Sequence, residues 1–539
     1  MISKINEAGQ SWDIIVIGGG ASGLGVALEA ATRGYKTLLL EQHDFAKGTS
    51  SKSTKLIHGG VRYLAQGNIK LVMGALRERG LLRKNAPHLV KDLPFIIPCY
   101  RWWDIFLYTV GLTLYDVLAG RLGLGRSLPL SKSAALKALP AIKAHKLKGG
   151  VVYHDGQFDD SRMAVNLFQS ICAHGGLALN YMQVSELVKE EGKVIGVVAV
   201  DRETDVSYTL KSKVVVNATG IFVNDILKMD SPGARDAVVP SQGVHLVVDS
   251  KFLNGRDALM IPKTPDGRVL FAIPWHNRVV IGTTDVEKEE AELEPHATEE
   301  EIDYILETAG RYYENPPKRE DILSVFAGLR PLAAPASEGK KTKEISRGHK
   351  ILTSKSGLFT LTGGKWTIYR EMGEDVIDKV EAMSGWPKTE SVTKHTKIHG
   401  FMDQHDEHAI EGAVEGAVEA TVEATVEVAF ESGSLDWYGS DEVVLRKMVD
   451  ESPEMGKFIS EKLRIIAAQL ILAVREEMAR SIEDFLARRV RALQLDAAES
   501  IRMAPEVARL MAKEMGKDGD WVEKQLEAYV ELSKGYIVN

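Results

Sequence analysis

Three cationic side chains beside glycine-containing turns are the first candidates for chemistry in this chain. Arg62 follows a glycine pair, Arg330 stands in a Gly-Leu-Arg-Pro turn, and Lys365 follows two glycines just before a helical pattern. An arginine fork matches a phosphate dianion in shape, and a lysine adds a point charge. If the fold brings these side chains together, they form an anion clamp. Taken singly, an arginine is more often the partner of a surface ion pair.

A histidine adds a group that can move a proton. His245 follows Gly243 and Val244 at the start of an apolar strand pattern. A neutral imidazole can take a hydroxyl proton near neutral pH. A lone histidine in such a strand is more often a hydrogen-bonded core residue, so its role depends on what the fold places beside it.

A nucleotide-binding pattern near the start of the chain supplies a frame for these groups. A short apolar run leads into Gly18, Gly20 and Gly23 in G-x-G-x-x-G spacing, followed by a helical stretch and a second apolar run that ends at Glu41. Gly18 permits a tight turn, Gly20 lets a pyrophosphate approach the backbone, and Gly23 lets the helix pack closely on the sheet. The helix N-terminus attracts that anion, and Glu41 can accept hydrogen bonds from ribose hydroxyls. The pattern predicts binding of an adenine dinucleotide.

Two further segments carry small or hydroxylated residues where a cofactor could approach. Residues 49–64, TSSKSTKLIHGGVRYL, follow the second strand, and their hydroxyl groups and lysines could hydrogen-bond phosphates or the edge of a ring. A valine-rich strand pattern runs into residues 217–220, NATG. Small residues at the carboxyl end of a buried strand mark a close backbone approach. The signal is weak alone and gains weight beside the glycine pattern.

The order of the patterns predicts an α/β chain with two lobes. Alternating strands and helices at the start indicate a parallel sheet. Strand patterns between residues 178 and 220 indicate hairpins lying on that domain, and those between 241 and 285 indicate a second, antiparallel lobe. A strand, a glycine turn and a helix over residues 356–380 can return the chain to the first domain.

The predicted domains are therefore discontinuous in sequence. We assign residues 1–95, 150–240 and 350–385 to the nucleotide-binding domain, 96–149 and 241–349 to the second lobe, 386–430 to a linker, and 431–539 to a C-terminal all-helical domain. Within the last domain, helices are expected over residues 461–480, 481–495, 504–517 and 521–534, with Ser481 and Asp484 forming a capping box. Glutamates repeat every four residues over 407–430, which predicts a solvated linker helix with repulsive charge spacing.

Composition limits the classes of function. The 539 residues are 44% hydrophobic and 26% charged, which is ordinary for a globular protein of about three domains. Cys99 and Cys172 are the only cysteines, which fits a reducing compartment and predicts no metal cluster. The net charge of −8 argues against general nucleic-acid binding. We expect neither a secretory signal nor a membrane span.

One basic window stands out in this acidic chain. Residues 101–150 carry eight lysines and arginines, which are Arg101, Arg121, Arg126, Lys132, Lys137, Lys143, Lys146 and Lys148, against Asp104 and Asp116. The window opens with an aromatic and aliphatic stretch over residues 102–120. Apolar residues beside cations suit the surface of an anionic membrane. The alternative is a buried helix followed by a solvated loop.

Several motifs in one order resemble the FAD-dependent glycerol-3-phosphate dehydrogenases. They are GGGASG (18–23), residues 49–64, NATG (217–220), IPW (273–275), IGTTDVE (281–287), GLRPL (328–332), GGKWTIYR (363–370) and EEMARSIEDFLARRVR (476–491). The resemblance implies a discontinuous Rossmann-like FAD domain, a substrate lobe and a helical C-terminal domain. It also implies oxidation of sn-glycerol 3-phosphate to dihydroxyacetone phosphate, with electrons delivered to quinone at the inner face of the cell membrane. The enzyme would be cytoplasmic and peripheral, and the oligomeric state stays open, with a homodimer among the options.

The resemblance assigns roles to residues by position. Arg62, Tyr63, Arg330 and Lys365 would surround the substrate, and His245 or Arg330 would assist proton transfer; we favour His245 because arginine is almost always protonated. The residues predicted to contact FAD are Gly18, Gly20, Ala21, Ser22, Gly23, Glu41, Thr49, Ser50, Ser51, Ser53, Lys55, His58, Gly59, Gly60, Val184, Ala218, Thr219, Gly220, Gly364, Lys365, Trp366 and Thr367.

Other functions remain to be weighed against this one. An oxidase of glycerol 3-phosphate would use O2 and release H2O2 through the same flavin chemistry. An amine or amino-acid oxidase would need a carboxylate pocket in place of a phosphate clamp. A flavin-binding membrane adaptor without catalysis would leave the clamp and the histidine unexplained.

Overall fold

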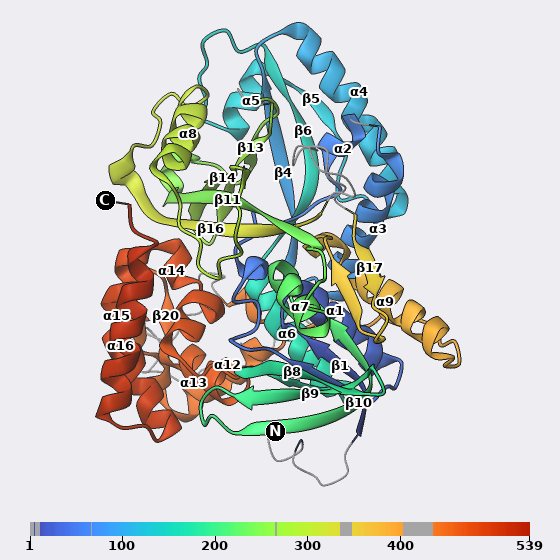
Figure 1. Cartoon of the computed structure of the whole chain (residues 1–539). Helices are drawn as coiled ribbons and strands as arrows, with labels where there is room; N and C mark the ends of the chain where they lie inside the picture. The colour runs from blue at the N-terminus through green and yellow to red at the C-terminus, as the bar shows by residue number, and fades with distance from the viewer. Residues whose placement is uncertain are drawn as a thin grey trace.

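The computed structural model describes residue 5 and residues 11–65, 67–264, 267–334, 348–402 and 435–538, without the side chains of Arg62 and Ala65. Two sheets lie one above the other in Figure 1, and the C-terminal helices, orange to red, stand beside them. The predicted α/β class with a C-terminal helical domain is confirmed. The glutamate repeat over residues 407–430 lies outside the described residues.

The first sheet contains the nucleotide-binding pattern. Its strands follow the order β17–β18–β10–β1–β2–β7, and a hairpin of β8 and β9 extends from β10. The pairs from β18 to β7 are parallel, as predicted. The bounds are β1 Ser11–Ile17, β2 Thr37–Leu40, β7 Leu177–Leu179, β8 Met182–Glu190, β9 Lys193–Asp201, β10 Ser207–Asn217, β17 Lys350–Thr353 and β18 Phe359–Thr362.

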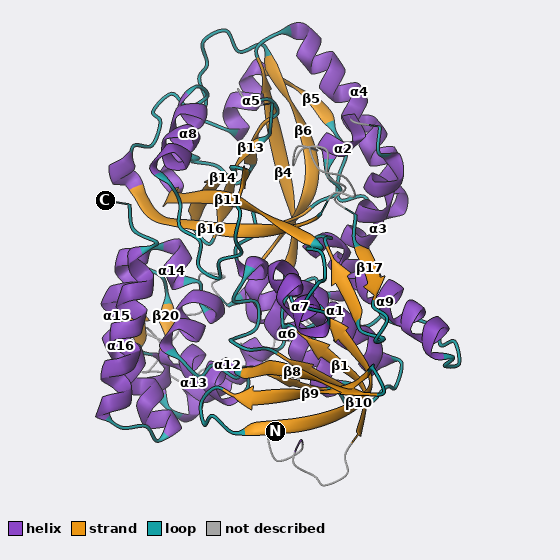
Figure 2. Ribbon diagram, viewed as in Figure 1, coloured by secondary structure: helices purple, strands orange, loops and turns teal. Residues whose placement is uncertain are grey.

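Strand β1 is buried on both faces because successive side chains alternate between two cores. Ile14 and Val16 pack with helices α1 (Ala21–Thr32), α6 (Asp160–Ala173) and α9 (Tyr369–Ser384). Ile15 and Ile17 pack with residues of β8, β9 and β10. Figure 2 shows β1 between these helices and the β8–β9–β10 layer. This double burial explains the continuous apolar run in the sequence.

The second sheet is almost wholly antiparallel, in the order β15–β11–β14–β13–β12–β4–β6–β3, with β16 on β11 and β5 on β6. Only the β12–β4 pair among these is parallel. The bounds are β3 Leu56–Ile57, β4 Val90–Cys99, β5 Leu128–Ser131, β6 Gly149–Phe158, β11 Val238–Asp249, β12 Ala258–Ile261, β13 Leu270–Trp275, β14 Arg278–Gly282, β15 Val286–Glu287 and β16 Ile322–Ala333.

This sheet differs from the domain boundaries that we assigned near residues 95 and 150. Strands β4 and β6 pair from Val90↔Phe158 to Cys99↔Gly149, so both belong to the second sheet along their whole length. The assigned boundary near 95 cuts β4, and the one near 150 puts β6 in the wrong lobe. Strand patterns show where a strand lies but not which sheet it joins.

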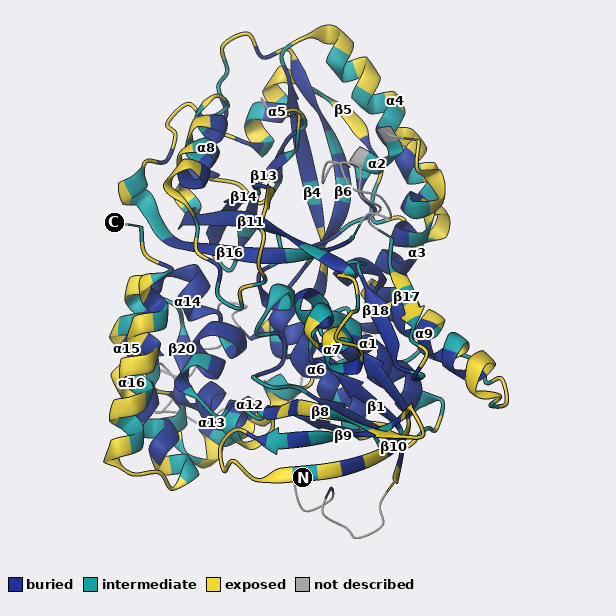
Figure 3. Cartoon of the chain, in the orientation of Figure 1, coloured by how far each residue is buried: buried dark blue, intermediate teal, exposed yellow. Residues whose placement is uncertain are grey.

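Helices cover the outside of the second lobe and connect it to the first. They are α2 Val61–Ala65, α3 Ile69–Asn85, α4 Trp102–Ala119, α5 Lys132–Ala138, α7 Val223–Asp230 and α8 Glu299–Gly310. Helix α4 is exposed along much of its length (Figure 3). Among the described residues, the stretch Trp102–Leu122 is long and apolar enough to cross a membrane by length and composition. Length and composition alone do not show that a helix crosses a membrane, so our expectation of no membrane span stays a prediction.

The C-terminal domain, residues 435–538, packs on the edge of both sheets. Its elements are α12 Asp441–Glu451, β19 Phe458–Ser460, β20 Ile465–Ile466, α13 Ala467–Arg475, a π-helical turn Asp484–Arg489, α14 Ala492–Leu495, α15 Ala497–Met515 and α16 Gly519–Lys534. The helix expected over 461–480 is confirmed only over α13: β20, which pairs with β19 in a small hairpin, precedes it, and residues 476–480 are not helical. The capping box is confirmed: Asp484 N donates to Ser481 Oγ (3.2 Å), and Ser481 N donates to Asp484 Oδ2 (3.0 Å).

Candidate active site

A cavity of about 480 Å³ is lined by residues of both sheets and of the loops between them. A smaller cavity of about 170 Å³ shares Thr54, Leu56, His58, Tyr63 and Arg330 with it. Most residues predicted to contact FAD line the larger cavity: Gly18, Gly20, Ala21, Ser22, Glu41, Thr49, Ser50, Ser53, His58, Val184, Ala218, Thr219, Gly220, Gly364, Lys365, Trp366 and Thr367. Segments more than 300 residues apart in sequence therefore meet around one space.

The glycine turn forms one wall of the cavity. Gly18 has φ +108°, a conformation that favours glycine. A Cβ on Gly23 would lie 1.9 Å from Gly18 O, so only glycine lets helix α1 start this close to β1. Helix α1 begins after Gly20, which has no side chain to cap it; Ser50 Oγ accepts from Ala21 N, and the other N–H groups of the first turn are left for a ligand. The turn therefore has the shape and polarity for a pyrophosphate.

Glu41 is held by backbone donors. Its Oε2 accepts from Gly19 N at 2.7 Å and its Oε1 from His43 N at 2.8 Å. Burial raises the pKa of Glu41 against the effect of these two N–H groups. The carboxylate thus stiffens the glycine turn, and its predicted bond to a ribose stays a prediction.

Segment 49–58 is hydrogen-bonded to three other parts of the cavity wall. Ser50 Oγ accepts from Ala21 N at 2.9 Å, and Trp366 Nε1 donates to Ser50 O at 2.8 Å. Thr49 Oγ1 donates to Leu329 O at 2.6 Å. These bonds join the glycine turn, the 364–367 turn and strand β16 around the cavity.

Some residues of the predicted cofactor set do not line the larger cavity: Gly23, Ser51, Lys55 and Gly59 lie behind its wall, and Gly60 lines the smaller cavity. Lys55 Nζ donates to Asp160 Oδ2 and to Ser51 O, both at 2.7 Å, and is fully buried. Burial, reinforced by Arg491, lowers the pKa of Lys55 to about 7 against the attraction of Asp160. The prediction that Lys55 contacts FAD does not fit this arrangement.

Strand pairing brings His245 and Arg330 to the same face of the second sheet. In the register of β11 and β16, His245 lies opposite Phe326 and Arg330 opposite Ser241. Side chains alternate along a strand, so residues 241, 243 and 245 share a face with 326, 328 and 330. A Cβ on Gly243 would lie 2.2 Å from Arg330 Nη2, so this glycine gives the guanidinium its place.

Arg330 is positioned by the segment that follows β14. Its Nη2 donates to Thr283 Oγ1 at 3.0 Å and to Thr284 O at 3.1 Å, and its Nη1 donates to Gln242 O at 3.3 Å. Asp285 Oδ1 lies 3.4 Å from Nη1. The guanidinium is therefore held in one orientation at the border of the two cavities.

Lys365 meets Tyr63 across the same space. Lys365 Nζ lies 4.1 Å from the centre of the Tyr63 ring, and both residues line the larger cavity. Arg62 belongs to α2, and its side chain lies outside the described residues. Of the predicted clamp, the structure thus brings together Tyr63, Arg330 and Lys365.

His245 is a buried, neutral imidazole. Its ring stacks on Phe326 with centroids 4.8 Å apart, and its Nε2 lies 3.0 Å from Thr54 Oγ1. Burial, together with the positive charges of Arg330 and Lys55, holds the pKa of His245 well below its usual range. The ring therefore stays uncharged at neutral pH, in the form that can accept a proton.

The partners that hold these side chains were not among the residues predicted from the sequence. Thr54, which contacts His245, lies in the quoted 49–64 segment, but it was not singled out there. Thr283 and Asp285, which hold Arg330, lie in the IGTTDVE motif without an assigned role. Lys52 lines the cavity and pairs with Glu294 at 2.6 Å. All four residues carry hydroxyl or charged side chains and lie inside the quoted family motifs, which is the signal that could have identified them.

Comparison with known proteins identifies the family. Residues 13–370 match the FAD dependent oxidoreductase family, and residues 391–522 match the C-terminal domain of alpha-glycerophosphate oxidase. The chain is 36% identical to the probable mitochondrial glycerol-3-phosphate dehydrogenase of Caenorhabditis elegans, over 98% of this chain and 73% of the relative. The chain belongs to the FAD-dependent glycerol-3-phosphate dehydrogenase family.

A second relative and a solved structure support this family assignment. The chain is 35% identical to the mitochondrial glycerol-3-phosphate dehydrogenase of Saccharomyces cerevisiae, over 98% of this chain and 89% of that one. It is similar to the structure of the Bacillus halodurans glycerol-3-phosphate dehydrogenase complexed with FAD, with a TM-score of 0.79, 29% identity, and coverage of 100% and 97% of the two chains. L-alpha-glycerophosphate oxidase from Mycoplasma pneumoniae shares the fold alone (16% identity, TM-score 0.54, 72% and 98% coverage).

FAD is the cofactor of this family, and the larger cavity fits it. The glycine turn and the first turn of α1 suit the pyrophosphate. The cavity extends from Glu41 and Val184 to His245 and Lys365, so one elongated molecule can reach both the nucleotide end and the histidine. The predicted cofactor and enzyme class are confirmed.

Proposed function

We propose that this enzyme oxidises sn-glycerol 3-phosphate to dihydroxyacetone phosphate and passes the electrons to membrane quinone. The observation that carries the proposal is a single cavity lined by a neutral imidazole and by two cations held in place, Arg330 and Lys365. A phosphate needs the cations, and a secondary alcohol needs a proton acceptor. The names of the relatives point to the same substrate.

The side chains divide the work of the reaction. FAD, when bound, supplies the acceptor for the hydride from C2. Arg330 and Lys365 bind the phosphate, and Tyr63 packs beneath the lysine. This anchoring fixes the distance between the alcohol and the acceptor, a positioning effect that can contribute several kcal/mol to barrier lowering. His245 takes the proton of the C2 hydroxyl, and Thr54 orients its ring.

An anaerobic absorbance spectrum tests the proposal. Addition of glycerol 3-phosphate should bleach the flavin band, while glycine, proline or glycerol at the same concentration should leave it nearly unchanged. A band that stays oxidised with excess glycerol 3-phosphate would contradict the proposed reaction. Bleaching by an amino acid would instead favour an amino-acid oxidase on this fold.

A second assay on the same sample identifies the electron acceptor. We expect fast reduction of a quinone analogue and slow release of peroxide in air. The match of residues 391–522 to an oxidase C-terminal domain keeps glycerol-3-phosphate oxidase as the second candidate. Fast peroxide release without quinone reduction would make that candidate the better one.

Helix α4 is the proposed contact with an anionic membrane. Seven of its large apolar side chains are exposed: Trp102, Trp103, Phe106, Leu107, Val110, Leu114 and Val117. Its other face is tied to the lobe, since Tyr115 is buried and its hydroxyl donates to Asp155 Oδ2 at 2.9 Å. A helix that is packed on the protein along one side is better suited to lie in the membrane interface than to cross the membrane. Arg101 and Arg121, exposed at its two ends, can meet anionic headgroups.

Seven of the eight cations in the predicted basic segment are exposed, and the eighth, Lys143, is half-buried. Lys143 Nζ donates to Gly310 O at 2.8 Å and so belongs to the packing of the lobe. The proposal rests on α4 with the exposed cations around it, and it places the enzyme peripherally on the cytoplasmic face of the cell membrane.

Exchanging Trp103 and Val110 together for aspartate should weaken sedimentation with anionic vesicles by more than about tenfold. The reason is that two apolar side chains, exposed in the free protein, would no longer be buried in the membrane interface. Activity with a water-soluble acceptor should be unchanged, and activity with membrane quinone should fall. Val443→Asp, at a half-exposed valine on α12, is the matched control. Vesicle binding equal in the double variant and the control would exclude α4 as the docking surface.

A further inference from the structure

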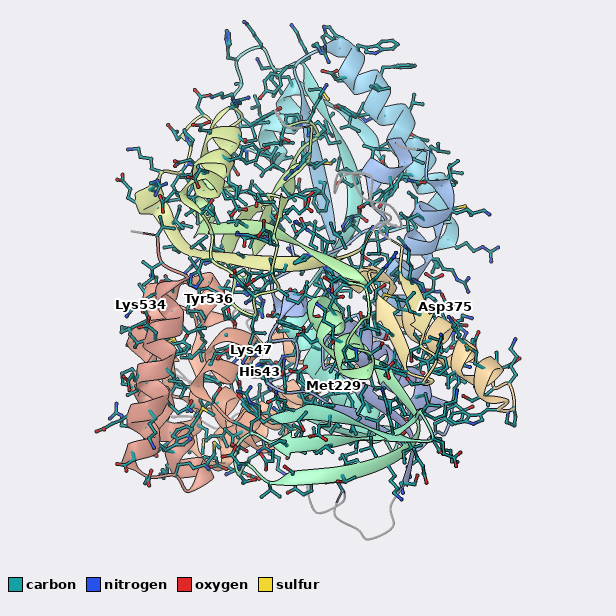
Figure 4. The ribbon with its side chains drawn as sticks, viewed as in Figure 1. His43, Lys47, Met229, Asp375, Lys534 and Tyr536 are labelled. Atoms are coloured by element: carbon teal, nitrogen blue, oxygen red, sulfur yellow. The ribbon has the colours of Figure 1, made fainter. Side chains whose placement is uncertain are left out.

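Two loops that line the FAD cavity are held from behind by one segment of the C-terminal domain. The first loop runs from Glu41 to Lys47, and its residues 41, 42, 43, 46 and 47 line the cavity. It also supports the glycine turn, because Ala46 N donates to Gly19 O at 3.0 Å. Figure 4 shows His43 and Lys47 of this loop next to the C-terminal helices.

Asp44 is the attachment point of this loop. It is fully buried and accepts two hydrogen bonds from Arg489, at 2.7 Å to Oδ2 and 2.9 Å to Oδ1. Arg488 Nε donates to Oδ2 at 2.5 Å. Lys47 and Glu483 add an ion pair of 2.7 Å at the end of the loop. A bidentate arginine fixes direction as well as distance.

Ser51 is the attachment point of the second loop. Its carbonyl oxygen accepts from Arg491 Nη2 and from Gln494 Nε2, each at 2.9 Å. Ser51 ends the short 3-10 turn Thr49–Ser51, and Ser50 in that turn contacts both the start of α1 and the Trp366 indole. A shift of Ser51 would therefore move two walls of the cavity.

The four donors come from a short stretch of unusual backbone. Arg488 and Arg489 end the π-helical turn Asp484–Arg489, and Arg491 has φ +62°. Turns of this kind are rare and occur often at functional sites. The side chains of Arg488, Arg489 and Arg491 are at most 3% exposed. None of the three has been given a place in the reaction.

We propose that the segment of residues 483–494 is a positioning element of the FAD site, which holds the 41–47 loop through Asp44 and the 49–51 turn through the Ser51 carbonyl. Buried ion pairs alone are weak evidence for stability. Here their acceptors lie one or two residues from cavity-lining groups in both loops. The C-terminal domain thus retains the cofactor without touching it.

The test compares FAD release from the holoenzymes of three variants. Arg489→Lys keeps the charge beside Asp44 but loses the two-pronged bond, and Gln494→Leu removes a neutral donor to Ser51. Arg475→Lys is the matched control, since Arg475 makes a similar two-pronged pair with Glu514 on the exposed side of the same domain. Release is followed by the fluorescence of free FAD, and helical content by circular dichroism.

Arg489→Lys should speed FAD release about tenfold, the effect of losing hydrogen bonds to a charged group. Gln494→Leu should speed it less, and Arg475→Lys should match the parent. Excess FAD should restore the parental kcat, because the chemistry of the site is intact. Parental release rates in folded Arg489→Lys and Gln494→Leu would overturn the proposal. So would equal acceleration in Arg475→Lys, which would indicate general loosening. If Arg489→Lys does not fold, Gln494→Leu decides alone.

Discussion

Replacement of His245 by asparagine should lower kcat about 100- to 10,000-fold, the usual effect of losing a general base. The imidazole is buried, neutral and held by Thr54 and Phe326, so an amide in its place keeps some packing but cannot take a proton. FAD content should stay at the parental level. The measurement is the rate of anaerobic flavin reduction in a single turnover, which isolates the chemical step from the acceptor.

The pH profile gives this prediction a second readout. A base works above its pKa, and the pKa of His245 is lowered by burial, so activity should persist below pH 6.5 and fall as the pH drops through the lowered value. The His245→Asn variant should lack this acidic limb. His154→Asn serves as the control, because His154 is a half-buried histidine of β6 that pairs with Asp92 of β4. Equal reduction rates in the His245 variant and the parent would remove His245 from the mechanism.

Replacement of Arg330 by alanine should raise the KM for glycerol 3-phosphate about 100-fold, since charged hydrogen bonds to a phosphate contribute roughly 1.5–3 kcal/mol each. FAD content should be unchanged, because Arg330 is bonded to the 283–284 segment and Gln242 at the substrate end of the cavity. Lys365→Met should act in the same direction. The measurement is steady-state kinetics together with the flavin absorbance of the purified protein.

Glycerol, used as an alternative substrate, tests whether the effect of Arg330→Ala depends on the phosphate. It lacks the phosphate, so its kcat/KM should be similar in the parent and in Arg330→Ala, although low in both. Tyr63→Phe keeps the ring under Lys365 and should change KM little. A KM that is equal in parent and variant, or a loss for glycerol as large as for the phosphoester, would show that Arg330 does not bind the phosphate.

The sequence predicted the local structure around the nucleotide-binding pattern well, because its signals are local. The turn after β1 and the close start of α1 are enforced by steric limits between near neighbours in the sequence, which glycine spacing reveals directly. The same holds for the capping box at Ser481 and for the strand, turn and helix around residues 359–384. Lys55 was misplaced because its ion-pair partner, Asp160, is distant in sequence.

What the amino-acid sequence determined by itself was the family, the cofactor and the residue types that the proposed clamp would use. Only the tertiary structure decided that Arg330 and His245 share a sheet face, that Lys365 lies over Tyr63, that β4 and β6 join the second sheet, and that Arg488 to Gln494 support loops more than 400 residues away. The reason is physical: backbone sterics and side-chain periodicity act between neighbours along the chain. Strand pairing, burial and buried ion pairs depend on which distant segments meet.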